Sequence, residues 1–74
     1  MNLKEFLENN PIINKSQLAQ LMWIDNKSAK SKLYNKLSEK TVGSGKQRIT
    51  ENDEEVAKKE LEKLAHRIVE YISN

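Results

Sequence analysis

Apolar residues along this chain recur at helical spacing in four segments, and each segment begins beside a residue that commonly caps a helix. The first segment opens at Asn2 and stops before Pro11, because the residue ahead of a proline is pushed out of the helical region. The second opens at Asn14, with Gln17 three residues later in the arrangement of a capping box. The third covers about residues 27–38 and the fourth residues 50–73, so we predict an all-α fold, a compact four-helix domain with a long C-terminal helix.

The second and third predicted helices each have one apolar face and one polar face. On the second helix we expect a buried stripe made of Leu18, Ala19, Leu21 and Met22. On the third, residues four positions apart share a face, which makes Ala29, Leu33 and Leu37 its inner side. A rotation of about 100° per residue then places three short polar residues on the opposite face: Ser28, Ser31 and Asn35.

Residues 39–49 separate this helix from the last one, and we predict a flexible basic loop or a short irregular hairpin there. Gly43 and Gly45 lie on either side of Ser44, which favours a turn. The letters GSGK resemble part of a phosphate-binding loop, but that signature needs Gly at position 40 and Ser or Thr at position 47. The chain has Lys40 and Gln47 instead, which excludes this interpretation.

The last helix begins with Thr50 as its predicted cap, followed by acidic residues that suit the positive end of a helix dipole. Its apolar residues follow alternating steps of four and three, which is the spacing of a heptad seam. A seam this wide can pack against its own domain and still offer apolar surface to a partner. We expect a homodimer or partner contact on its later part: Leu61, Leu64, Ile68, Tyr71 and Ile72.

Composition and charge limit the function classes. The 74 residues allow a single domain, residues 1–74, with a small core. The net charge of +2 conceals a division, because residues 15–48 carry +6 and residues 51–74 carry −3. A basic half is expected to meet a polyanion, whereas a solvated lysine-rich surface is the simpler alternative. The chain has no cysteine and no apolar run long enough for a signal peptide or a membrane span, so we expect a cytoplasmic protein with no membrane contact.

Residues 14–38 resemble the helix-turn-helix unit of the phage repressor and Cro family. The resemblance lies in the sequence QLAQLM at residues 17–22, in which Ala19 holds the position where a small residue lets the second helix pass close by. Ile24 matches the apolar residue of the turn, and Leu33 matches the residue that anchors the recognition helix. The resemblance implies a transcriptional regulator whose recognition helix, about residues 27–38, lies in the major groove of double-stranded DNA.

Two features depart from the family pattern. Trp23 stands where the family usually has a glycine with a left-handed backbone, and the spacing from Ala19 to Leu33 is about one residue longer than usual. A bulky residue in that conformation costs about 1 kcal/mol or more, so the sequence predicts a turn of different shape or a register shifted by one position.

The predicted DNA contacts fall into two groups. Short polar side chains approach base edges closely, and lysines neutralise phosphates. We expect these residues at base edges: Lys27, Ser28, Ser31, Lys32 and Asn35. We expect these residues at phosphates: Lys15, Gln17, Lys30, Lys36, Lys40, Lys46 and Arg48. Trp23 is expected in the core rather than against DNA, while Tyr34 lies between the buried face and the groove-facing side.

Other functions have less support in the sequence. His66 has Glu62 and Glu70 one turn away on either side, a pattern common by chance on charged helices, so we expect no metal site. With no cysteine and one histidine, we expect neither an enzyme nor a cofactor or small-molecule ligand. The main alternative is a protein-interaction module, an inhibitor or adaptor that uses the apolar seam of the last helix and has no DNA affinity. Small phage and mobile-element proteins often use such folds in this way.

Overall fold

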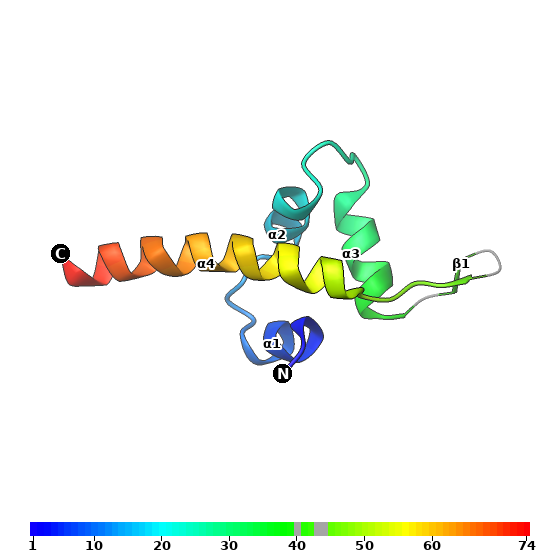
Figure 1. The fold of residues 1–74 in the computed structure, drawn as a ribbon, viewed down its shortest axis with the longest axis horizontal. Coiled ribbons are helices and arrows are strands. Elements are labelled where there is room, and N and C mark those ends of the chain that lie inside the picture. The colour runs from blue at the N-terminus through cyan, green and yellow to red at the C-terminus, as the bar shows by residue number, and fades with distance from the viewer. Residues whose placement is uncertain (40, 43–44) are drawn as a thin grey trace.

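The computed structural model describes residues 1–39, 41–42 and 45–74, and over these residues it contains four helices and one short hairpin (Figure 1). In chain order the elements are α1 (Leu3–Asn9), α2 (Lys15–Met22), α3 (Ala29–Leu37), β1 (Thr41–Val42), β2 (Gly45–Lys46) and α4 (Glu51–Ser73). The strands pair antiparallel, with Thr41 opposite Lys46 and Val42 opposite Gly45. The all-α prediction is therefore confirmed, and the segment after α3 contains the short hairpin rather than a loop without structure.

The long helix α4 organises the molecule. In Figure 1, α1 lies on one side of its first half and α2 on the other, with α3 beside α2 and the hairpin beyond α3. The second half of α4 extends past all of these elements, and the molecule measures 51 × 27 × 20 Å. The predicted compact shape is wrong in this respect. A helix of 23 residues is about 34 Å long, which is more than the shorter helices α1, α2 and α3 can cover.

Side chains cap three of the four helices as the sequence predicts. Asn2 Oδ1 accepts the Glu5 N–H at 2.9 Å, and Asn14 Oδ1 accepts the Gln17 N–H at 3.1 Å. The Glu54 carboxylate on α4 accepts the Leu3 N–H at 3.0 and 3.1 Å, which satisfies a further free donor at the start of α1. A residue of α4 thereby fastens α1 to the rest of the fold.

A small apolar core joins the helices. Its buried members come from every helix: Leu3, Leu7, Leu18, Ala19, Met22, Ala29, Leu33 and Ala57. The buried stripe predicted for α2 is confirmed apart from Leu21, which is 45% exposed. The buried face of α2 is formed by Leu18, Ala19 and Met22, and Leu21 lies at the edge of this face, beside α4.

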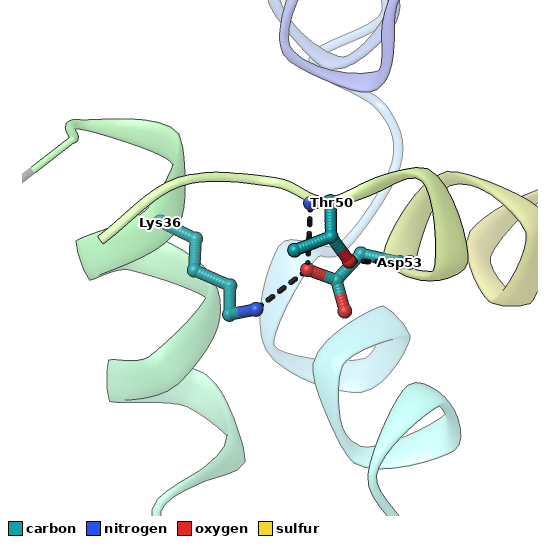
Figure 2. A network of polar contacts seen from close by, with 3 residues as sticks. All are labelled: Lys36, Thr50 and Asp53. Carbon is teal, nitrogen blue, oxygen red and sulfur yellow. Dashed lines mark hydrogen bonds and ion pairs between the residues drawn. The ribbon is translucent and has the colours of Figure 1, made fainter. Parts of the chain in front are cut away.

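A polar contact joins α3 to the start of α4 (Figure 2). The Lys36 ammonium donates to Asp53 Oδ2 at 2.6 Å, and the same oxygen accepts the Thr50 N–H at 2.9 Å. The Asp53 N–H in turn donates to Thr50 Oγ1 at 3.1 Å, which completes a capping box at the start of α4. One carboxylate therefore caps α4 and holds the last turn of α3 against it.

Asp53 is buried, and burial alone raises the pKa of a carboxyl group. The hydrogen bonds from Lys36 and Thr50 outweigh this effect and lower the pKa of Asp53 below its usual value of 3.8. A carboxyl with a lowered pKa in the folded state stabilises the fold above its unfolded-state pKa. That stabilisation is lost as the pH falls through the folded-state pKa.

We expect Asp53→Asn to lower the free energy of unfolding at pH 7 by on the order of 2 kcal/mol. This is less than for a fully buried ion pair, because the Lys36 and Asp53 side chains remain 12% and 7% exposed. Urea unfolding followed by circular dichroism at pH 7 and at pH 3 measures the effect. The difference between variant and parent should shrink at pH 3, and an equal difference at both pH values would contradict the role of the charge.

Candidate nucleic-acid interface

Close packing of α2 against α3 sets the orientation of the candidate surface. Ala19 on α2 and Ala29 and Leu33 on α3 are all inaccessible to solvent or nearly so. Two alanines at this contact leave room for the helix backbones to approach closely, while Leu33 fills the space between the helices. The inner face predicted for α3 is thereby confirmed, with Leu37 half-buried at its end.

The turn between the helices, residues 23–28, has no left-handed residue. Trp23 has φ −133° and ψ 71°, so it avoids the conformation in which a bulky side chain is strained. Trp23 O accepts the Asn26 N–H at 3.0 Å, and Asn26 O accepts the Ala29 N–H at 3.2 Å. This turn therefore differs in shape from the family turn, and Ile24 within it is 79% exposed rather than an apolar anchor.

The turn continues to Ser28 and α3 begins only at Ala29. Lys27 and Ser28 therefore precede the helix instead of belonging to it. Asn26 Oδ1 accepts the Ser28 N–H at 2.8 Å, which holds this part of the turn in place. Both Lys27 and Ser28 remain exposed, as does Ser31 on α3, while Asn35 is half-buried. The predicted start at about residue 27 or 28 is therefore one or two residues early, because the side chain of Asn26 continues the turn, and the helix ends at Leu37.

One flank of α3 carries a tyrosine between two lysines. The Lys30 ammonium lies 6.0 Å from the centre of the Tyr34 ring, and the Lys15 ammonium lies 5.9 Å from it. Lys15 is the first residue of α2, so the packing of α2 on α3 brings a cation from another helix beside α3. Tyr34 is 43% exposed, which settles its position at the edge of the polar face rather than in the core.

The single tryptophan, Trp23 at the end of α2, lies beside the opposite flank of α3. The Lys32 ammonium lies 4.6 Å from the centre of the Trp23 ring, and the Lys36 ammonium lies 5.7 Å from it. The ring itself is half-buried against the core, as expected from the sequence. Lys36 faces inward to Asp53, so its ammonium group is engaged within the fold, and we leave it out of the candidate surface.

The remaining predicted contact residues do not belong to α3. Gln17 is exposed near the start of α2. Lys46 on β2 pairs with Glu39 at 3.3 Å in an exposed ion pair of little energetic weight. Arg48 borders a hollow that is also lined by Lys4 of α1 and by Lys36 and Leu37 at the end of α3. Lys40 lies outside the described residues, as does Gly43 of the predicted turn.

Two features of the structure around α3 were not predicted from the sequence. The Lys36–Asp53 pair joins residues 17 positions apart, and the only local signal, an acidic residue three positions after Thr50, explains the helix cap without indicating the second partner. The lysines around Tyr34 and Trp23 likewise gather through packing of α2 on α3. Spacing within α3 predicts which residues face outward but not which residues of α2 lie beside them.

Other kinds of site find no support among the described residues. Within residues 1–39, 41–42 and 45–74, no three acidic or histidine side chains gather as a metal ion would require. His66 lies 3.7 Å from Glu62 on the exposed side of α4. None of the helices in the described part of the chain is long and apolar enough to cross a membrane.

Comparison with known proteins gives no match: no family model, no curated protein and no solved structure is similar to the chain at a significant level. Function is therefore inferred from the chemistry of the α3 surface.

We expect Ala19→Leu to lower the free energy of unfolding by about 1–3 kcal/mol, because a larger side chain at this fully buried position forces α2 and α3 apart. Gln20→Leu places the same side chain one position farther along, where the surface is exposed, and serves as the control. Thermal unfolding of both variants measures the difference. Equal stability of the two variants would contradict the close approach of the helices.

Proposed function

We propose that this protein binds double-stranded DNA as a small transcriptional regulator, with α3 as the helix that enters the major groove. The observation that carries the proposal is the outer face of α3. It presents short polar side chains between two flanks of lysines, and the helix contains no acidic residue. A helix of this kind fits the width of the major groove, and its short side chains allow its backbone to approach the bases.

The lysines supply affinity that is independent of sequence. Lys15 and Lys30 lie together on the Tyr34 side of α3, and Lys32 lies on the Trp23 side. Each phosphate neutralised releases a condensed counterion, which favours binding at low salt. Contacts on both flanks also fix how the helix lies in the groove, since phosphate contacts set the register of a protein on the duplex. Lys27, exposed in the turn before α3, adds a further cation at its N-terminal end.

Sequence preference would come from the strip between the flanks. Ser31 and Asn35 lie one helical turn apart on α3, and Ser28 precedes them at the N-cap. The amide of asparagine pairs with two atoms of adenine in the major groove, and a serine hydroxyl donates to or accepts from several bases. Asn35 is therefore the residue from which we expect most base discrimination.

A protein-interaction module without DNA affinity is the second candidate. It is favoured by the apolar side chains exposed along the second half of α4, which a monomer leaves without cover. This surface lies on a different part of the molecule from α3, so the two candidates are tested by separate variants.

We expect the double variant Ser31→Glu, Asn35→Glu to lose DNA binding, because two carboxylates then face the phosphate-lined groove. Fluorescence anisotropy of a labelled duplex, titrated with protein at about 50 mM salt, a condition that favours phosphate contacts, measures the binding. The control is Asn52→Glu with Ser73→Glu, which makes the same change in charge at exposed positions of α4. Unchanged binding by the α3 variant, with circular dichroism showing intact helices, would contradict the proposal.

We expect Lys15→Gln with Lys30→Gln to reduce the salt dependence of duplex binding. Each lost phosphate contact lowers the slope of log K against log salt by about 0.9, so the pair should lower it by about 1.8. Lys59→Gln with Lys63→Gln removes two lysines from α4 and should leave the slope unchanged. The slope is measured from anisotropy titrations at four or more salt concentrations. A slope that falls equally in both variants would show a general charge effect instead of contacts at these positions.

A further inference from the structure

The second half of α4 extends beyond the body of the molecule (Figure 1). Large apolar side chains are exposed along this half. Ile68, Val69, Tyr71 and Ile72 are 48%, 57%, 82% and 69% exposed. They continue the apolar stripe to which the buried Ala57 and the half-buried Leu61 belong in the first half of the helix. A contiguous apolar surface of this extent on a small protein marks a place where another molecule packs.

An apolar groove lies directly beside this row. It has a volume of about 380 Å³ and runs between α1 and α4, with Leu3 and Phe6 on one wall and Ala57, Leu61 and Ala65 on the other. The groove ends at Ala65, where the exposed row begins. Each molecule thus carries both an apolar ridge and an adjoining apolar groove, which is the self-complementary arrangement that a two-fold interface needs.

We infer that a second copy of this chain covers this surface, with the two α4 helices antiparallel and the two-fold axis near Ala65. In this register Val69 of one copy lies level with Leu61 of the other. Ile72 lies level with Lys58, over the groove that Phe6 lines. The small side chain of Ala65 lets the two helices approach closely where they meet. The same contacts occur twice, once on each side of the axis, so the exposed row of each copy lies beside the groove of the other.

Charge favours the antiparallel direction over the parallel one. The last turn of α4 has no basic residue, so its carbonyl groups, the negative end of the helix dipole, have no cation beside them within the chain. Antiparallel pairing brings Lys58 of the second copy level with this turn. Parallel pairing would place two such negative ends together. Parallel pairing would also leave the groove beside the first half of α4 unfilled, because the exposed row of one copy would then lie level with the exposed row of the other.

The same register suits a two-fold DNA site, a step that rests on the proposed function. Lys36 attaches α3 to α4 at Asp53, so the separation of the two Asp53 residues approximates the spacing of the two α3 helices. With the axis at Ala65 and a rise of about 1.5 Å per residue, this separation is about 36 Å along α4. Successive major-groove faces on one side of a duplex are about 34–36 Å apart.

Sedimentation of the full chain without DNA tests the association independently of the proposed function. We expect the mass of a dimer for the parent and of a monomer for Ile72→Glu, whose helicity should be unchanged because Ile72 is mostly exposed in the single chain. Ser73→Glu adds the same charge one residue later and should remain dimeric. A parent that stays monomeric at concentrations of several hundred micromolar overturns the inference, whether or not the protein binds DNA.

Cross-linking tests the direction of pairing, and the chain has no cysteine to compete. Ala65→Cys should form an intermolecular disulfide in high yield, because the two residues meet at the axis within the roughly 4.4–6.8 Å between Cα atoms that a disulfide allows. Tyr71→Cys is the matched control: it is more exposed, but in the antiparallel register its two copies lie about 18 Å apart along α4. Preferential cross-linking of Tyr71→Cys would overturn the antiparallel arrangement. Equal slow cross-linking of both variants, as random collisions produce, would overturn it as well.

Discussion

The architecture depends on one carboxylate, that of Asp53, which is the only buried charged side chain in the described part of the chain. It accepts a backbone N–H at the start of α4 and the ammonium group of Lys36 at the end of α3 (Figure 2). A buried carboxylate is costly unless several donors surround it, so α3 and α4 must keep their relative position for the fold to be stable. The next residue, Glu54, binds the start of α1 in the same manner. The first turn of α4 is thus the point at which α1 and α3 are both fixed.

Fixing α3 by its last turn leaves its other face free. Lys36 and Leu37 turn inward at the end of the helix, while Ala29 and Leu33 pack on α2. Ser31 and the lysines on either side of it are left on the outer side of the helix. The alanines of the α2–α3 contact hold the two helices too close together for larger side chains to fit between them. The candidate DNA surface is therefore a consequence of how α3 is held, since the same contacts that bury one face determine which residues the other face presents.

The two halves of α4 have the same apolar pattern and different surroundings. In the first half, the helices that pack on either side bury Ala57 and half-bury Leu61. In the second half, Ile68 and Ile72 continue the pattern where none of the other described elements reaches. A helix stabilised by packing on one end only would be expected to fray at the other, because isolated helical segments of this length are marginal in water. A second copy that packs on the free half would stabilise it and would give the protein two copies of α3.

Much of the local structure followed from the sequence alone. The caps at Asn2, Asn14 and Thr50, the helical periods and the inner face of α3 all depend on residues within one or two turns of each other, and such interactions are readable from spacing. The candidate surface was predictable to the same extent, as the outward strip of one helix. Tertiary structure alone decided that Lys36 pairs with Asp53 and that Lys15 lies with Lys30 beside Tyr34. It also decided that α4 extends beyond the other helices. These outcomes depend on how helices distant in sequence pack together, and periodicity within one helix carries no information about which neighbour its side chains will meet.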